Sequence, residues 1–444
     1  MPIRFAVPGL AALALLVLGA ALVVAEPMPS AQPSLAAALP PSGTPSPSPA
    51  QVAPRDANVA LWQARLDAGG GYATTLHLVD ALIERARATG TLTDLARARE
   101  ALDAVEADAP ATDPGLPLRQ GRISFALHEF ASAREAAAVA LTVDPTDPAA
   151  LALAADAALE MGDLEAADAA YARLAEAGRR PPILSRLARR AWLGGDVEEA
   201  EALVREAIRA ASFVEDGDEV AFYHYQLGEM LRARNAFAEA EAEYRAALDA
   251  QPDHVPSSGG LALVRAALGD RGEAIRLLET ATTRLPAPDL VAALGDLYAL
   301  DGRADDAADQ WTLVERIADV GQANGGVYDR QLVLFLADHD RDPEGAVALA
   351  TAELELRGDV YAHDALAWSL FKAGRLAEAD AAAAEALRLG TPDGRIHYHA
   401  GLIAEALGRT EDARALLSFA ADHRGALPPR QASLLADAVE RLVP

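Results

Sequence analysis

The sequence contains no cysteine, which excludes disulfide bonds, thiolate metal sites and a cysteine nucleophile. Aromatic residues make up only 5% of the 444 residues, and much of the apolar fraction is alanine, so helix formers dominate over strand formers. Basic residues are also scarce, because 39 Lys and Arg stand against 66 Asp and Glu, a net charge of −27. Such a charge repels phosphate backbones. We therefore expect an all-α protein that has no nucleic-acid partner.

Sequence motifs of the common enzyme classes are missing as well. The one lysine, Lys372, follows no glycine-rich loop, so a P-loop is excluded. The sequence holds no G-x-S-x-G, G-x-G-x-x-G or H-E-x-x-H pattern. His397 and His399 are two residues apart, which places them on different faces of a helix. We predict no catalytic residue, no cofactor and no metal site, and expect that the chain is not an enzyme.

Three aspartates in the segment DHDRDPEG, residues 338–345, alternate as they do at the start of a calcium-binding loop. Pro343 stands where the tight-turn glycine of such a loop belongs, and Leu349 stands where its closing acidic residue belongs. We interpret Asp338, Asp340 and Asp342 as a solvated turn between two helices.

The N-terminus has the composition of an export signal. Arg4 precedes an apolar run over residues 10–25, which ends in small or medium side chains. Residues 1–25 are predicted to be a signal peptide cleaved after Ala25 or, alternatively, a retained membrane anchor. Residues 26–56 are rich in Pro, Ser and Ala and are predicted to be an extended linker. We expect an extracytoplasmic protein, secreted or membrane-anchored, that meets a membrane only through an uncleaved N-terminal segment.

An internal repeat organises the rest of the chain. A marker alanine recurs every 33 to 40 residues, and most units carry glycine or alanine twelve residues before it and alanine seven residues after it. This spacing places small side chains on one face of each helix, where two helices can approach closely. Glycines between the two helices suit a helix end with positive φ. The marker alanines are Ala96, Ala133, Ala167, Ala200, Ala240, Ala274, Ala307, Ala346, Ala379 and Ala413. The glycines are Gly162, Gly195, Gly269, Gly302, Gly374 and Gly408.

This pattern, over about residues 72–425, resembles the tetratricopeptide repeat family. The resemblance implies a right-handed superhelical solenoid of about ten antiparallel helix pairs, which we place at residues 57–427. Residues 428–444 carry apolar side chains at helical spacing and are predicted to form a C-terminal capping helix over the last repeat.

In this family the first helix of each unit lines a concave wall that binds extended or helical peptides. By the resemblance, positions eight, eleven, fifteen and eighteen residues before a marker alanine face that wall. Packing between helix pairs is the alternative role for the aromatic residues among them. The predicted partner-binding groove consists of Tyr225, Tyr328, Gln331, Phe335, Tyr361, Asp364, Trp368 and Tyr398.

A basic cluster on earlier first helices has two interpretations. Its arginines would receive an acidic segment or a carboxylate, or they would form balanced surface ion pairs. The cluster is Arg119, Arg122, Arg186 and Arg189. The sequence as a whole predicts a non-catalytic extracytoplasmic scaffold that binds a protein or peptide in a concave groove. The alternative is a module that recognises an envelope glycan or small ligand with the aromatic face of the C-terminal repeats.

Overall fold

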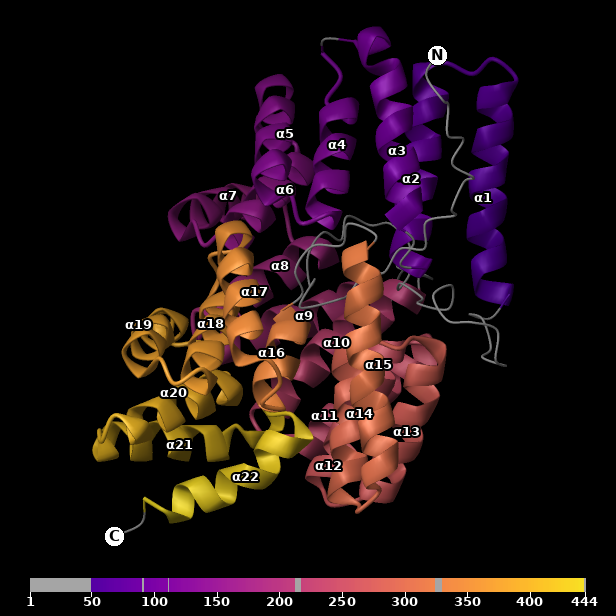
Figure 1. Cartoon of the computed structure of the whole chain (residues 1–444). Coiled ribbons are helices and arrows are strands. Elements are labelled where there is room, and N and C mark those ends of the chain that lie inside the picture. The colour runs from indigo at the N-terminus through magenta and orange to yellow at the C-terminus, as the bar shows by residue number, and fades with distance from the viewer. Residues whose placement is uncertain (1–48, 90–91, 111, 212–216, 324–329, 443–444) are drawn as a thin grey trace, which may run out of the picture.

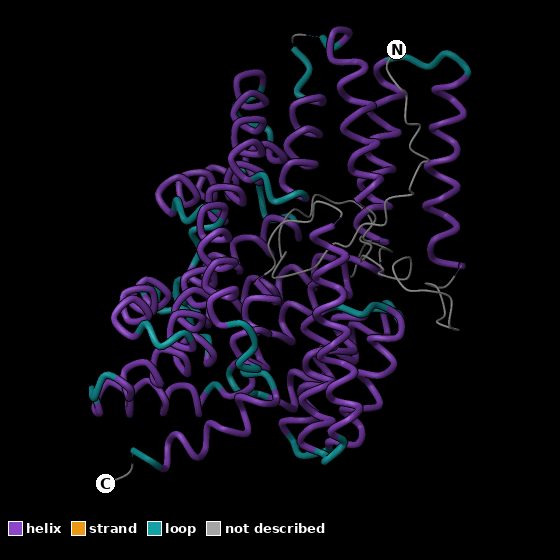
Figure 2. The backbone as a smooth tube through the Cα atoms, viewed as in Figure 1, coloured by secondary structure: helices purple, strands orange, loops and turns teal. Residues whose placement is uncertain are grey.

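The computed structural model describes residues 49–89, 92–110, 112–211, 217–323 and 330–442, and this part of the chain contains helices and loops but no strand (Figure 2). The predicted export signal, residues 1–25, and the linker as far as residue 48 lie outside the described residues. Helix α1 (Pro49–Asp67) begins inside the segment predicted to be linker. Pro49 takes the first helical position, where the missing N–H of proline costs nothing.

In the described residues ten antiparallel helix pairs follow α1, and each pair joins a first helix to a second helix (Figure 1). The pairs, numbered as units 1 to 10, are α2 (Tyr72–Thr89) with α3 (Leu92–Val105), α4 (Gly115–Ala126) with α5 (Phe130–Val143), α6 (Pro148–Glu160) with α7 (Leu164–Glu176), α8 (Pro181–Leu193) with α9 (Val197–Ala211), α10 (Gly217–Ala233) with α11 (Phe237–Ala250), α12 (Val255–Ala267) with α13 (Arg271–Arg284), α14 (Pro288–Leu300) with α15 (Ala304–Ala323), α16 (Arg330–Asp338) with α17 (Pro343–Leu356), α18 (Val360–Lys372) with α19 (Leu376–Leu387), and α20 (Gly394–Ala406) with α21 (Thr410–Asp422). Two 3-10 turns, η1 (Glu106–Asp108) and η2 (Arg424–Ala426), and helix α22 (Pro429–Glu440) complete the set. The all-α solenoid of helix pairs is therefore confirmed.

Nine of the ten marker alanines are completely buried between helices, each with 0% of its surface exposed. The exception is Ala96, which is exposed, so this assignment is wrong. In the first unit Leu95, Ala98 and Leu102 form the buried face of α3, and Ala98 occupies the marker position. The helical register of this unit therefore differs by two residues from the register that the sequence predicted.

The turns inside the units adopt the left-handed backbone conformation that the glycines predicted. All six predicted glycines have φ between 75° and 86°. His128, Asn235 and Asp340 occupy the corresponding place in other units, with φ of 62°, 63° and 53°. Asparagine and aspartate tolerate this region better than most side chains.

Successive turns of the solenoid touch one another, so units 3 to 5 contact the loops that precede units 9 and 10 and helix α22. The amide of Gly358 donates to the carbonyl of Glu160 at 3.0 Å. The hydroxyl of Thr391 donates to the carbonyl of Leu193 at 2.7 Å. In Figure 1 the orange helices α17 and α18 accordingly lie beside the purple helices α6 to α8.

The third of these contacts is made by Asn235 at the turn of unit 5. Its amide group donates to the carbonyls of Ala421 and Asp422 at 3.1 and 2.8 Å. Its side-chain oxygen accepts from the amide of Gly425 at 2.9 Å. The C-terminal units are therefore fixed to the middle of the chain by one backbone–backbone hydrogen bond and by bonds of the Asn235 and Thr391 side chains with backbone groups.

Candidate functional site

The first helices carry a ladder of ion pairs between neighbouring units. Arg119 and Arg122 of α4 both pair with Asp80 of α2, and the Arg122 bond measures 3.1 Å. Arg119 also donates to the carbonyl of Gly115 at 2.9 Å. These two members of the predicted basic cluster therefore share one carboxylate of the preceding unit.

The other two members of the cluster lie on α8 and are buried. Arg186 is 3% exposed and pairs with Asp156 at 2.8 Å, while Arg189 is 8% exposed and pairs with Glu160 at 2.6 Å. Both carboxylates belong to α6, the first helix of the preceding unit. Each arginine of the cluster thus has a partner inside the chain, as in the ion-pair interpretation, although the pairs on α8 lie in the interior rather than on the surface.

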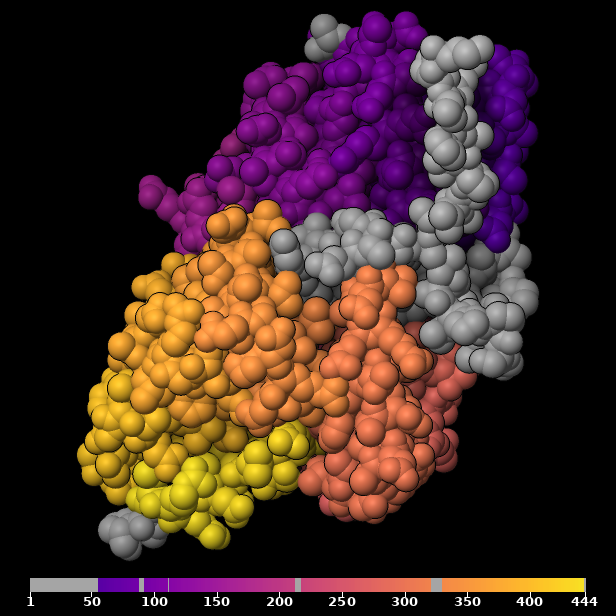
Figure 3. Space-filling model, viewed as in Figure 1, coloured from indigo at the N-terminus to yellow at the C-terminus, as the bar shows by residue number. Residues whose placement is uncertain are grey.

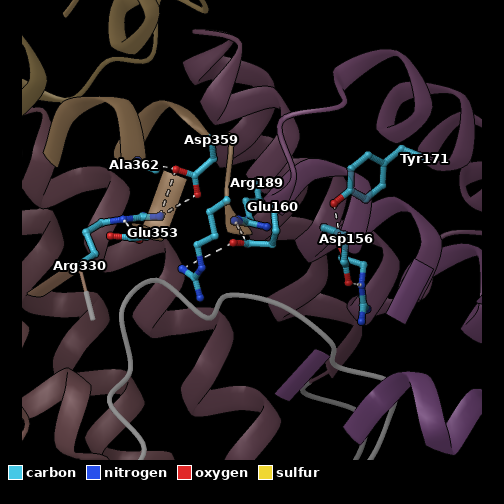
Figure 4. A network of polar contacts seen from close by, with 10 residues as sticks. Asp156, Glu160, Tyr171, Arg189, Arg330, Glu353, Asp359 and Ala362 are labelled. Atoms are coloured by element: carbon cyan, nitrogen blue, oxygen red, sulfur yellow. Dashed lines mark hydrogen bonds and ion pairs between the residues drawn. The ribbon is translucent and has the colours of Figure 1, made fainter. Parts of the chain in front are cut away.

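This ladder continues across the contact between successive turns (Figure 4). Glu160 also lies 3.6 Å from Arg357, in the loop after α17. Nearby, Arg330 donates to Glu353 at 3.0 Å and to Asp359 at 3.0 and 3.1 Å. These buried charges balance one another and connect unit 3 to units 8 and 9.

The buried arginines act on a neighbouring histidine and on one of their paired carboxylates, Asp359. Burial, together with the charges of Arg357 and Arg330, lowers the pKa of His128 to about 3. Burial alone would raise the pKa of Asp359, but Arg330 and Arg357 outweigh it and hold that pKa below the usual value. The network therefore keeps the Asp359 carboxylate charged and the His128 imidazole neutral at pH 7.

Three residues of the predicted groove come together in units 9 and 10. Asp364, Trp368 and Tyr398 are buried, with 1%, 4% and 3% of their surface exposed. The Trp368 ring stacks on the imidazole of His399 with centroids 4.2 Å apart, and its centroid lies 6.2 Å from that of Tyr398. Lys372 lies over the same indole at 5.2 Å.

The remaining groove residues do not join this group. Phe335 is 3% exposed and packs in the cluster of buried side chains around α14. Tyr361 is half-buried, with the Arg330 guanidinium 5.7 Å from its ring centroid. The half-buried Tyr225 lies near His254 in unit 6, with ring centroids 5.6 Å apart. Gln331 is half-buried on α16, and Tyr328 lies outside the described residues. The role of all these residues in binding a partner stays a prediction.

The predicted place of Asp338 in a solvated turn is wrong, because the Asp338 carboxylate accepts from the indole N–H of Trp368 at 2.8 Å and from the amide of Gln431 at 2.6 Å. Burial raises its pKa, although these two hydrogen bonds oppose the shift. Asp338 lies eight residues before Ala346, a position on the predicted groove face, and this spacing was the available signal.

His399 and Asp364 form a second layer beneath Asp338. The imidazole Nδ1 of His399 lies 2.8 Å from the Asp364 carboxylate, and its Nε2 lies 2.8 Å from the Gln431 amide nitrogen. Burial alone would raise the pKa of Asp364, but the hydrogen bond from His399 and the charge of Arg395 act in the opposite direction, and the pKa is lowered. Because an amide nitrogen can only donate, Nε2 of His399 is the acceptor and Nδ1 carries the proton.

Helix α22 covers this group. It contacts α12, α14 and α21, and its Leu435 and Ala438 belong to the same buried apolar cluster as Trp368 and Tyr398. In the space-filling view the yellow C-terminal segment lies against both the orange C-terminal units and the salmon units 6 and 7 (Figure 3). We call the surface beneath it the α22-binding face, which consists of Asp296, Asp338, Asp364, Trp368, Tyr398 and His399.

The family profile described as tetratricopeptide repeat matches residues 185–255, 260–319 and 365–426. These ranges fall on units 4 and 5, units 6 and 7, and units 9 and 10, each of which has a fully buried marker alanine. The chain is a tetratricopeptide repeat protein. Tetratricopeptide repeats support a role as a protein-interaction scaffold.

Solved structures include several neighbours of this tetratricopeptide repeat protein. The type IV pilus biogenesis factor PilW is 17% identical, covers 46% of this chain and 92% of its own, and has a TM-score of 0.39. A Rap protein complexed with Competence and Sporulation Factor is 13% identical, with coverages of 82% and 99% and a TM-score of 0.48. The human IFIT1 dimer with PPP-AAAA is 14% identical, with coverages of 84% and 87% and a TM-score of 0.46. No curated protein matches the sequence.

Proposed function

We propose that this tetratricopeptide repeat protein is a non-catalytic scaffold that binds a protein or peptide outside the cytoplasm, through the α22-binding face. The observation that supports the proposal is that this face already holds an amphipathic helix, whose Leu435 and Ala438 pack in the same buried cluster as Trp368 and Tyr398. Helix-in-groove recognition uses apolar anchors at successive turns of the bound helix, with buried aromatic residues as the main source of binding energy.

The extracytoplasmic location rests on the N-terminal sequence. The apolar run over residues 10–25 and the Pro-rich stretch after it have the order of an export signal and a spacer. In the described part of the chain, no helix combines the length and hydrophobicity needed to cross a membrane. Fractionation of cells that express the tagged chain tests the location, and recovery in the cytosol alone contradicts it.

Partner capture from envelope extracts tests the binding role. We expect Trp368→Ala to lower the recovery of bound protein by about 30-fold, the effect of losing a hot-spot residue worth 2 kcal/mol. Trp62→Ala is the matched control, because Trp62 lies on α1 and stacks on His77, away from units 8 to 10. Tyr361→Ala is a second, half-buried variant, and thermal unfolding shows that each variant is folded. Equal recovery by all folded variants contradicts the assignment of this face.

Recognition of a glycan by stacking of sugar rings on the same aromatic residues has less support. Trp368 and Tyr398 are buried against His399 and the cluster that includes Leu435, so neither ring presents a free face. A helix, which is already seated there, fits the observed contacts better.

A further inference from the structure

The C-terminal helix α22 is bound to the rest of the chain as a ligand helix would be. Gln431, Leu435 and Ala438 are its buried residues after Pro429, and they lie at positions i, i+4 and i+7 on one face. The opposite face, which includes Ser433 and Ala436, is exposed, and Leu434 beside the buried face keeps 45% of its surface in solvent. The helix reaches across to α14 and α12 of units 6 and 7, so it does more than cover the last repeat.

The N-terminus of α22 is capped by another helix. Its own N-cap residue, Pro428, makes no side-chain capping bond. Instead, the Asp296 carboxylate of α14 accepts a hydrogen bond from the backbone N–H of Arg430 at 3.3 Å. A carboxylate at this place satisfies an amide that the helix leaves unpaired and complements the positive end of the helix dipole. The second oxygen of Asp296 is held by His339 at 2.8 Å.

The buried polar side chain of α22, Gln431, is recognised by two polar groups. The amide nitrogen of Gln431 has two protons, and it lies 2.6 Å from the Asp338 carboxylate and 2.8 Å from Nε2 of His399. Asp338 and the Nδ1-protonated form of His399 both accept, so they match an amide donor and leave no place for an apolar side chain. An apolar residue here would leave Nε2 of His399 without a donor and would remove one of the two hydrogen bonds that Asp338 accepts, which is the basis of discrimination against it.

The next two turns of α22 make apolar contacts. Leu435 is 4% exposed and Ala438 is 1% exposed, and both pack in the cluster that contains Trp368, Tyr398 and Leu417. The α22-binding face therefore contacts three features of the helix in order: its N-terminus, an amide side chain, and an apolar pair made of a leucine and an alanine.

From these contacts we infer that α22 is a built-in occupant of a helix-recognition site, and that the partner is an amphipathic helix with the pattern Gln-x-x-x-Leu-x-x-Ala. The inference rests on the proposed function, because it specifies which proteins the scaffold binds. The partner helix replaces α22 on the α22-binding face and places its own N-terminus at Asp296. In the free protein α22 keeps this face closed.

The attachment of α22 allows it to leave without disturbing the repeats. The preceding turn η2 is fixed separately, because Gly425 bonds to both Asn235 and Arg232 of unit 5. The chain between η2 and α22 is short, so α22 competes at a high effective concentration. Of the helix residues after Pro429, only Gln431, Leu435 and Ala438 are buried, and a 12-residue helix is marginal on its own. Loosening α22 therefore increases the fraction of chains that can accept a partner.

A fluorescent peptide of residues 427–442, LPPRQASLLADAVERL, is the probe for this site, and its binding to the full chain is followed by anisotropy. We expect it to bind the Leu435→Ala protein at least about tenfold more tightly than the wild type, because the apparent Kd falls as the open fraction rises. Leu434→Ala is the matched control, since the same change at the exposed neighbour leaves α22 in place. A peptide with leucine in place of the glutamine loses binding to the Leu435→Ala protein.

Ser433→Pro is a second variant that disrupts α22 from its exposed side and leaves the α22-binding face unchanged. It should also bind the peptide at least about tenfold more tightly than the wild type. Equal affinities of the wild type and both loosened variants, all shown to be folded by circular dichroism, overturn the inference. If the wild type still captures an envelope partner in that case, the proposed function stands. If the peptide binds as expected but no partner is captured, the proposed function fails and the α22 site remains.

Discussion

At the scale of single residues, the solenoid depends on positions that have no room for a larger side chain. A Cβ atom on Gly228 would lie 2.7 Å from the ring of Tyr244, and one on Gly260 would lie 2.4 Å from the same ring. The marker alanines occupy equally closed positions, with 0% of their surface exposed. Close packing of this kind leaves little space for relaxation.

Ala240→Leu should therefore destabilise the protein. The added carbon atoms have no space between α10 and α11, and overpacking of a closed core costs about 1–3 kcal/mol. Ala238→Leu on the same helix is the control, because Ala238 is exposed and a surface change stays within about 0.5 kcal/mol. Urea unfolding measures both variants, and similar losses for the two would contradict the assigned face.

Small residues were predictable from the sequence, whereas buried polar residues were not. The repeat of alanines is visible because it recurs in phase. The prediction was wrong in the first unit, where Ala98 and not Ala96 is the buried alanine. Asp338 and Arg186 resemble surface charges in the sequence. Their burial depends on partners 93 and 30 residues away, Gln431 and Asp156, which no local pattern reveals.

At the scale of elements, helix ends are held by unusual caps as well as by common ones. Asp147, Asp163 and Asp270 cap their helices with a carboxylate, as helix N-termini prefer. His254 caps α12 with its imidazole, which accepts from the backbone N–H of Ser257 at 3.3 Å. Burial lowers the pKa of His254 to about 3, so the capping group stays neutral.

The His254 cap predicts a loss of stability in acid. Below pH 6.5 the unfolded chain binds a proton at this histidine while the folded chain does not, so unfolding becomes more favourable as pH falls toward 3. The loss at pH 4 is about 3 kcal/mol relative to pH 8. His254→Asn keeps a capping oxygen and does not titrate, so its stability should fall less over this range.

Denaturant unfolding at pH 8 and pH 4 measures this difference. At pH 8 the histidine is neutral in both states, so the two proteins then differ only in contacts that do not titrate, namely the helix cap and the contact with the Tyr225 ring. If the wild type and His254→Asn lose the same free energy of unfolding between pH 8 and pH 4, His254 does not control the acid sensitivity.

The existence of the helices followed from the repeat, but the place of α22 did not. Apolar residues at helical spacing predicted a helix over residues 428–444, and α22 spans Pro429–Glu440. Its position across units 6 and 7 depends on Asp296 of α14, which lies 134 residues before Arg430. Contacts between such distant segments follow from the curvature of the whole solenoid, and curvature cannot be read from one repeat.

At the scale of the whole molecule, the solenoid is closed by contacts between its own turns. Gly162 of unit 3 meets Gly358 so closely that a Cβ on Gly162 would lie 2.2 Å from the Gly358 carbonyl oxygen. Buried ion pairs and hydrogen bonds join the same two regions, through Glu160, Arg357 and Arg189. Repeats that would otherwise touch only their neighbours are thereby coupled over long distances.

Two glycine variants separate the cost of backbone conformation from the cost of opening this contact. Gly162 and Gly374 both have φ of 75°, but a Cβ on Gly374 would meet nothing within 4 Å. Gly374→Ala should lower the free energy of unfolding by about 1–2 kcal/mol and leave the radius of gyration unchanged. Gly162→Ala should lower the free energy of unfolding by more than Gly374→Ala does, and it should enlarge the radius of gyration measured by small-angle X-ray scattering. Identical behaviour of the two variants would show that the contact between turns does not hold the shape.

The closing contacts also set an order of events during synthesis. The carbonyl of Leu193 leaves the ribosome 198 residues before Thr391, the residue that will donate to it. At about 5–20 residues per second, this edge of the nascent chain waits about 10–40 s for its partner. Units 3 to 5 therefore spend that interval with an uncovered rim, which is when a chaperone or a neighbouring nascent chain has access to it.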